Sequence, residues 1–494
     1  MVVALPTPRV QVHSEHRDGG GPSSSLQLAI VPRHAPEDGA WVSFVQGPVT
    51  RERVEAPSSH QQDKSRAAHF SVRLPMSVES DPSGQLGAHD KGVEQAVDTG
   101  SRFSLQAVAN VEFTPGSQAS GAHGRLFYLD SLRALAALYV VAGHIGLTIA
   151  APWRPLQDLL EDGDLSVVLF IVVSGFSLGI AATRSRDRRY RTFIRRRAWR
   201  ILPPYWAALA LSIILTLTVI PTGAGTIWSD SAPISWPGAL INVAAFQDFS
   251  HTIRSPDYPV WSIAVEWHLY FFFPLLFAIA SRRFGRVAVL VVGLCATGLL
   301  WIPWDHVPAP GFPPALALLF VVGALASTLV SASDGIAMRV RAMLSPSVAT
   351  GLGICGILLG VLFARQWQNH FLGDVCLGLG VAPLLVGYAR APQYWGRRLL
   401  EVRPLVWLGF FSYSLYLVHA PIIQVVWQYV VHPLHLGPRV SFALIMVMGP
   451  VAAILVAFVF HLIFERPFIN YRTWNTVVSV YRNPRRLFMR SSDR

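Results

Sequence analysis

The sequence contains little charge, and almost none of its positive charge is lysine. Only 14% of its 494 residues are charged, whereas 52% are hydrophobic; a soluble domain carries about 25% charged residues. Lys64 and Lys91 are the only lysines, so the net charge of +12 comes from arginine. The arginines cluster between long apolar runs, which favours membrane topology over nucleic-acid binding. We therefore expect a membrane protein and no nucleic acid partner.

Cysteine is scarce as well. Cys295, Cys355 and Cys376 are isolated within apolar segments, and no Cys-x-x-Cys or Cys/His ligand spacing is present. Zinc sites and disulfide frameworks need such spacing. The sequence therefore predicts no metal cofactor, and we expect the three cysteines to be small core residues.

Residues 1–125 differ in composition from the rest. Stretches such as "RDGGGPSSS" and "SDPSGQLGAHDKG" are rich in Gly, Ser, Pro and charge and have no sustained periodicity. Such a segment cannot bury enough apolar surface to offset its ordering entropy. No apolar run follows "MVVALPTPRV", so we expect no cleavable signal peptide. We predict a disordered, cytoplasmic N-terminal extension, or an upstream segment that lies outside the functional protein.

Ten apolar runs follow Arg125, each near the length of about 20 residues that spans a bilayer. They lie near 127–150, 165–183, 201–220, 259–280, 287–303, 313–331, 346–364, 371–389, 404–429 and 440–464. A shorter run at 236–246 predicts an interfacial or re-entrant piece. The predicted fold is all-α, a polytopic membrane helix bundle of about ten transmembrane helices over residues 126–466. A basic cytoplasmic tail, residues 467–494, is expected to follow it.

The distribution of arginine predicts the orientation of this bundle. Nine arginines lie within residues 184–200, and the same side collects those at 282–286, 339–341 and 390–403. The opposite loops hold little more than Arg154, Arg254, Arg365 and Arg439. Basic loops stay in the cytoplasm, so both termini are predicted to be cytoplasmic. We expect a multi-pass protein of the inner (cytoplasmic or plasma) membrane, in contact with membrane lipids.

Several ionisable side chains lie inside the predicted spans. In "YLDSLRALAALYVVAGHIG", Arg133 and His144 are eleven residues apart, which places them about 20° apart on one helix face and separates them by about 16 Å. Glu266 lies about 10 Å below the outer surface, close to the predicted depth of His144, and His268 faces away from it. Charged groups at such depth are costly unless they are paired or face a cavity. We predict that His144 and Glu266 face one cavity and act together.

Four more residues are expected to line this cavity. Tyr413, Tyr416 and His419 recur every three residues along the ninth span and form a polar stripe on one helix face. Asp130 lies one turn before Arg133 in the first span. We predict that these four side chains contact the substrate or the cavity that holds it.

The arginines at the inner side indicate the chemistry of a ligand. Arg197 and Arg200 are neighbours at i and i+3, and with Arg133 they form a predicted cationic funnel that opens to the cytoplasm. Guanidinium pairs well with phosphate, and an imidazole can take a proton from a hydroxyl. A coenzyme A thioester has phosphates that suit the arginines and a reactive acyl group that could reach His144. Our hypothesis is that the arginines bind acyl-CoA and that His144 is a general base oriented by Glu266.

A series of motifs resembles the acyltransferase-3 family of integral membrane O-acyltransferases. The motifs are "YLDSLRALAALYVVAGHIG" with Arg133 and His144, "FIVVSGFSLGI", "FIRRRAWRILPPYW" with Arg197 and Arg200, "VWSIAVEWHLYFFFPLL" with Glu266, "LGFFSYSLYLVHAPI" and "FERPF". They occur in the family's order, and the resemblance covers roughly residues 125 to 470.

The resemblance implies transfer of an acyl group, most often acetyl, from cytoplasmic acyl-CoA (acetyl-CoA) to a hydroxyl of a carbohydrate or a lipid-linked glycan acceptor. Acylation of a small natural product such as a macrolide is an alternative. Family members often carry an esterase-like domain after the membrane part, and this sequence ends soon after "FERPF". We therefore expect the enzyme to complete the transfer itself or to use a separate extracytoplasmic acyl-accepting partner.

Two other classes of function stay open on the sequence. A proton-coupled membrane transporter would use His144 and Glu266 as a proton relay, and a structural assembly factor for glycan export would use neither. Within the enzyme hypothesis, His144 acts either as a general base, which we favour, or as a transient acyl-histidine.

Overall fold

The computed structural model describes residues 9–12, 28–31, 125–185, 187, 189–220, 226–249, 255–282, 284–306, 313–367, 369–471 and 473–482. The chain divides into two units, Pro6–Ser120 and Met1–Leu5 with Gly121–Arg494. In the first unit, strands β1 (Arg9–Val12) and β2 (Leu28–Val31) pair antiparallel. The disorder predicted for the rest of the N-terminal extension lies outside the described residues.

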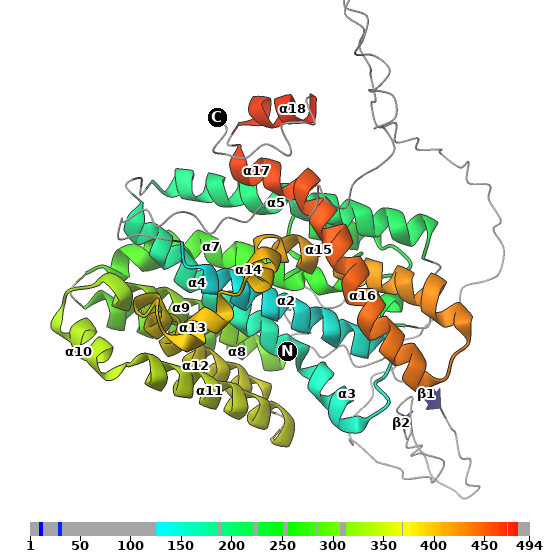
Figure 1. The fold of residues 1–494 in the computed structure, drawn as a ribbon, viewed down its shortest axis with the longest axis horizontal. Helices are drawn as coiled ribbons and strands as arrows, with labels where there is room; N and C mark the ends of the chain where they lie inside the picture. Colours follow the sequence, from blue (N-terminus) through cyan, green and yellow to red (C-terminus); the bar gives the residue numbers. More distant parts are fainter. Residues whose placement is uncertain are drawn as a thin grey trace, which may run out of the picture. The chain divides into compact units, whose positions relative to one another are not determined.

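The second unit is built from helices joined by short connections, and its described residues contain no strand (Figure 1). Its long helices are α2 (Phe127–Thr148), α4 (Leu165–Arg184), α5 (Tyr190–Thr218), α7 (Trp261–Ala280), α8 (Gly285–His306), α9 (Pro314–Ser331), α11 (Pro346–Gln366), α12 (His370–Arg390), α15 (Ser412–Val426) and α16 (Pro438–Phe460). Among the described residues, nine helical stretches are long and apolar enough to cross a membrane, and Gly285–Leu299 within α8 is a further, shorter apolar stretch. The predicted all-α, polytopic bundle is confirmed.

Shorter elements connect or extend these helices. They are α3 (Arg154–Glu161), η1 (Asp162–Asp164), η2 (Ile227–Asp230), α6 (Trp236–Val243), η3 (Gln247–Phe249), η4 (Tyr258–Val260), α10 (Gly335–Met343), α13 (Trp395–Leu400), α14 (Arg403–Phe410), η5 (Trp427–Val431), η6 (His432–Leu434), η7 (His461–Glu465), α17 (Arg466–Asn470) and α18 (Trp474–Arg482). The run predicted as too short to cross is the eight-residue helix α6. The predicted tail forms α17 and α18, and its residues 483–494 lie outside the described part.

The ninth predicted span, 404–429, is two helices instead of one. Helix α14 ends at Phe410, the next residue, Phe411, has a φ of −123° and a ψ of 20° that are not helical, and α15 begins at Ser412. Gly409 lies so close to α2 that an added Cβ would be 2.3 Å from the carbonyl oxygen of Asp130. The break therefore coincides with a backbone contact between α14 and the first turn of α2.

The three cysteines differ from the prediction. Cys295 and Cys355 are exposed on α8 and α11, and Cys376 is half-buried on α12. These helices present apolar side chains such as Leu294 and Ile354 on their outer faces, as expected of helices that contact lipid. Apolar neighbours in the sequence therefore did not show that these cysteines belong to the packed core.

Helix α2 lies at the centre of the helical unit and packs against α4, α14, α15 and α16 (Figure 1). Helix α4 in turn crosses α9 through glycine. A Cβ on Gly175 would lie 2.3 Å from the carbonyl oxygen of Phe320, and one on Gly323 would lie 2.2 Å from that of Val172. Small residues allow such close approach between membrane helices. This crossing fixes the position of α4 beside α2.

We expect the Gly175→Ala substitution to lower the Tm of the purified protein in detergent. The added methyl would force the α4 and α9 backbones apart, and overpacking of this kind costs about 1–3 kcal/mol. Gly351→Ala on α11 is the matched control, because an added Cβ there meets nothing within 4 Å; alanine's higher helix propensity should keep or raise the Tm. Equal losses in both variants would contradict the backbone contact as the cause.

Candidate active site

A cavity of about 830 Å³ lies among α2, α4, α5, α7, α14, α15, η7 and α17. This volume is within the range of about 300–1,000 Å³ that small-molecule sites occupy. Of the residues predicted from the sequence, its lining includes Asp130, Arg133, Arg197, Arg200, Glu266, Tyr413 and Tyr416. The structure thus brings together every predicted site residue except the two histidines, His144 and His419.

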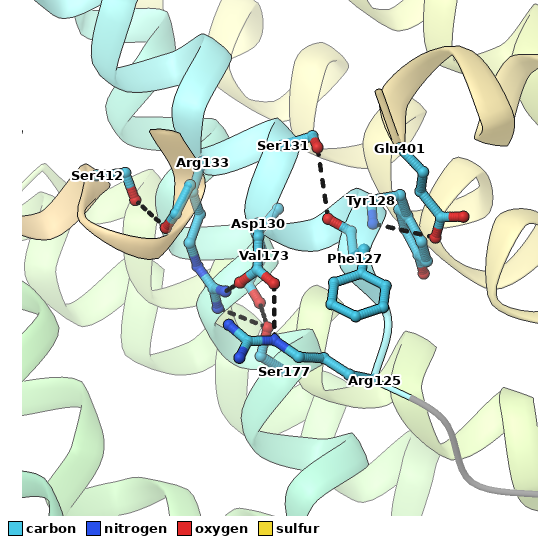
Figure 2. Close-up of polar contacts among 11 residues, drawn as sticks. Arg125, Phe127, Tyr128, Asp130, Ser131, Arg133, Val173, Ser177, Glu401 and Ser412 are labelled. Atoms are coloured by element: carbon cyan, nitrogen blue, oxygen red, sulfur yellow. Dashed lines mark hydrogen bonds and ion pairs between the residues drawn. The ribbon is translucent and has the colours of Figure 1, made fainter. Parts of the chain in front are cut away.

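Arg133 is held at the cavity wall by neighbours on two helices (Figure 2). Its Nη2 donates to the Ser177 hydroxyl of α4 at 2.7 Å, and its Nη1 lies 3.6 Å from Asp130 Oδ1 on α2. Asp130 Oδ2 also accepts a hydrogen bond of 2.9 Å from Arg125 Nε. A guanidinium buried within a helix bundle needs such partners, because an unpaired charge there is costly. Arg133 is therefore fixed in place before any ligand arrives.

Arg197 and Arg200 differ from Arg133 in their polar contacts. Within the described residues, neither forms an ion pair or donates a side-chain hydrogen bond. The Arg197 guanidinium lies over the rings of Phe193, at 5.7 Å, and Tyr270, at 5.9 Å. Two cations without a carboxylate partner at one end of a cavity create a field that favours an anionic ligand.

Glu266 lies at the same end as these arginines. Its Oε1 accepts a hydrogen bond of 2.5 Å from the Ser174 hydroxyl and another from the Tyr270 hydroxyl. Among the described residues, Glu266 forms no hydrogen bond with His144; the His144 ring instead contacts Tyr258, which lies just before α7, with ring centroids 5.1 Å apart. Glu266 is eight residues further along, or about 12 Å by helical rise. Among the described residues, the side chain that hydrogen-bonds His144 is therefore His419 and not Glu266.

His144 forms a hydrogen-bonded pair with His419 beyond the cavity. Its Nδ1 lies 2.6 Å from His419 Nε2, and the two rings are nearly parallel with centroids 4.8 Å apart. His419 Nδ1 lies 2.7 Å from the carbonyl oxygen of Tyr416. A carbonyl only accepts, so in neutral rings His419 Nδ1 carries a proton, its Nε2 accepts from His144 Nδ1–H, and His144 Nε2 keeps a lone pair. The pair thus presents one basic nitrogen.

A short segment from the loop before α7 covers this pair. Tyr258 contacts the His144 ring edge-on and also lies 5.9 Å from the Trp228 ring. The preceding residue, Asp257, is buried and its Oδ2 accepts a 2.7 Å hydrogen bond from the Ser212 hydroxyl of α5. Burial raises the pKa of Asp257 to about 7. A carboxyl that is protonated below about pH 7 therefore anchors the segment that holds Tyr258 beside His144.

Several polar residues of the site were not predicted. Ser174 donates a hydrogen bond to Glu266, and Ser177 accepts one from Arg133. The sequence could have indicated them, because they are two hydroxyl residues three positions apart in an otherwise apolar run. Glu465 is 1% exposed and accepts hydrogen bonds from Ser414 Oγ at 2.5 Å and His461 Nδ1 at 2.8 Å. It is the carboxylate of the "FERPF" motif, which had no assigned role.

A family model described as an acyltransferase domain matches residues 126–462. The chain belongs to the acyltransferase-3 family. It is therefore an integral, multi-pass membrane enzyme of that family. Within the described part of this acyltransferase-3 chain, no group of three or more His, Cys, Asp or Glu residues is arranged to hold a metal ion.

Curated relatives of this acyltransferase-3 protein are distant in sequence. Peptidoglycan O-acetyltransferase OatA of Listeria monocytogenes is 23% identical over 320 residues, which cover 60% of this chain and 49% of that protein. Acyltransferase MdmB of Streptomyces mycarofaciens is 26% identical over 328 residues, covering 61% and 79%. O-acetyltransferase OatA of Staphylococcus aureus is 24% identical over 330 residues, covering 61% and 51%. The chain spans about half the length of the two OatA proteins. No solved structure matches it.

We expect pH to change the stability of this acyltransferase-3 protein through Asp257. An aspartate has a pKa near 3.9 when unfolded, and the fold raises it to about 7. The stability that the neutral carboxyl contributes is full below about pH 4 and is lost as pH rises through 7. Asp257→Asn can still accept the Ser212 hydrogen bond but cannot ionise.

The measurement is the Tm of wild type and variant in detergent between pH 5 and 8. The difference in Tm should move in favour of Asp257→Asn as pH rises. A difference that is the same at every pH would show that Asp257 does not titrate in this range.

Proposed function

We propose that the protein is a membrane O-acetyltransferase that moves an acetyl group from cytoplasmic acetyl-CoA to a hydroxyl of a carbohydrate or exported glycan. One observation carries the proposal: a cavity has unpaired arginines at one end and a histidine pair with one free basic nitrogen just beyond its other end. Two of the relatives are named as O-acetyltransferases, one of them as acting on peptidoglycan. Their names support the acetyl group, and that of the Listeria protein supports the glycan.

The arginine end is proposed to bind the phosphates of the donor. Among the described residues, Arg197 and Arg200 form no direct ion pair that a ligand would have to break, and Arg133 is held close to them by Ser177. Glu266 lies within electrostatic reach of Arg133 and Arg197. We propose that its carboxylate, hydrogen-bonded to Ser174 and Tyr270, keeps these guanidinium groups in place when the cavity is empty. Its role would then be at the donor end.

The histidine pair is proposed to activate the acceptor. His144 Nε2 would take the proton of the acceptor hydroxyl as its oxygen attacks the thioester carbonyl. The C–S bond then breaks, and the coenzyme A thiolate takes the proton from His144. His419 accepts the hydrogen bond from His144 Nδ1 throughout, so it fixes the tautomer and stabilises the imidazolium. His419 is a positioning residue, in the place first predicted for Glu266.

The arginine distribution supports the direction of this transfer. The end of the cavity with Arg197 and Arg200 belongs to the basic side of the bundle, which is predicted to be cytoplasmic. Acyl-CoA would enter there, and the acceptor would reach His144 from the outer side of the cytoplasmic membrane. Transport by a proton relay remains the competing function, and it predicts no cleavage of a thioester.

We predict that His144→Ala abolishes acetyl transfer in protein reconstituted in lipid, because the variant has no base. His419→Ala should lower kcat by about 10²–10⁴, the usual contribution of acid–base catalysis. His419→Gln, whose amide oxygen can accept from His144 Nδ1–H, should recover part of this loss and shift the pH profile. The assay follows release of free thiol from acetyl-CoA with and without a pool of glycans.

The outcomes separate the alternatives. Wild-type turnover by His144→Ala would overturn the proposed base. A burst of thiol without acceptor would indicate an acyl-enzyme instead of direct transfer. No thiol release with any acceptor would favour the transporter.

We expect the double variant Arg197→Ala with Arg200→Ala to raise the KM for acetyl-CoA at least about tenfold, with a smaller effect on kcat. Each lost charge-assisted hydrogen bond is worth about 1.5–3 kcal/mol. The double variant Arg195→Ala with Arg196→Ala is the matched control, because these arginines lie on the same helix but do not line the cavity. Equal KM values for the two double variants would remove Arg197 and Arg200 from the donor site.

A further inference from the structure

We propose that Phe170 and Tyr416 form a wall at the deep end of the cavity and restrict the transferred group to short acyl chains, acetyl or propionyl. The inference rests on the proposed function, and it names the residues that determine the acyl group. The arginines of the proposed donor site line the cavity, whereas His144, the proposed base, does not.

Tyr416 connects the cavity lining to the histidine pair, and Phe170 packs against it. Phe170 of α4 and Tyr416 of α15 both line the cavity, and their rings meet edge to face with centroids 5.8 Å apart. The Tyr416 ring also lies 5.8 Å from the His419 ring, which contacts His144. An acyl group that approaches the histidine pair from the cavity along this contact would therefore meet these two rings.

Tyr416 is held firmly in this position. Its hydroxyl lies 2.7 Å from the Ser262 hydroxyl of α7 and donates to the carbonyl oxygen of Pro259 at 2.5 Å. The side chain is also buried, with 6% of its surface exposed. Because movement of the ring would break both hydrogen bonds, Tyr416 resists displacement by a bulky ligand.

The geometry of acyl transfer determines which part of the donor meets this wall. The thioester carbonyl must come within about 3–3.5 Å of the acceptor oxygen, which in turn must lie within about 3 Å of His144 Nε2. The carbonyl must therefore approach the rings, and carbons attached to it must fit among Phe170, Tyr416 and Val167, which lines the same end. An acetyl group adds one methyl there, and each further methylene adds volume beside rigid rings.

The wall and the base use different parts of Tyr416. Its side chain closes the cavity, whereas its backbone carbonyl accepts the hydrogen bond from His419. Changes in the rings at the wall should therefore alter the choice of acyl group and leave the histidine pair intact. Phe170 is the better position to vary, because its side chain has no polar atom to leave without a partner.

The test compares kcat/KM for acetyl-CoA and butyryl-CoA in the full chain, measured by thiol release with one glycan acceptor. The wild type should strongly prefer acetyl-CoA. In Phe170→Ala the butyryl-to-acetyl ratio should rise at least about tenfold, since two buried methylenes are worth about 1.6 kcal/mol. Phe170→Leu should change the ratio in the same direction by less, and it serves if the alanine variant does not fold.

Phe410→Ala is the matched control. Phe410 lines the same cavity at its arginine end, where its ring lies 4.3 Å from the Arg125 guanidinium. This variant gains the same space but should keep the wild-type ratio within about twofold. An unchanged butyryl-to-acetyl ratio in both Phe170 variants would contradict the proposal that Phe170 and Tyr416 restrict the acyl group. A wild type that uses butyryl-CoA as well as acetyl-CoA would contradict it too. Loss of all thioester turnover in the wild type would instead overturn the proposed function.

Discussion

A charge inside a membrane protein needs a partner or a polar cavity, and much of this structure follows from how one guanidinium meets that need. Arg133 lies in an apolar helix and is satisfied by Ser177 of the neighbouring helix and by Asp130 one turn away. These contacts require α2 and α4 to lie close together. The glycine crossing between α4 and α9 and the contact of Gly409 with the first turn of α2 provide that arrangement. The cavity lies where these helices meet.

The buried polar groups of the histidine pair are satisfied in a different way from Arg133. Within the described part of the chain, His144 and His419 form no ion pair with a carboxylate, and the hydrogen bonds between them and to the Tyr416 carbonyl fit neutral rings. The carbonyl oxygen of Tyr416 determines where the proton on His419 lies, and His419 determines where the proton on His144 lies. Positive charge is thus concentrated at one pole, and a neutral base lies at the other. Such a division suits a donor with anionic phosphates and an uncharged reactive end.

Much of this organisation was readable from the sequence, and the failures have physical causes. Helical rise placed Arg133 and His144 on one face at different depths, because a single regular helix connects them. The depth of Glu266 could not be read in the same way, since it depends on where α7 begins relative to α2. The cavity in the structure is lined by Glu266 but not by His144. The partner of His144 is His419 of α15, whose ring is oriented by the Tyr416 carbonyl three residues earlier in the same helix.

All six cations that line the cavity are arginine: Arg125, Arg133, Arg184, Arg197, Arg200 and Arg466. The two lysines of the chain both lie within residues 1–125. A lysine in a desolvated pocket readily loses its proton, and its amine then attacks acyl groups. A guanidinium stays protonated and is a poor nucleophile. A cavity built from arginine can hold an activated thioester without becoming acylated itself, so the missing lysines protect the protein from its own proposed substrate.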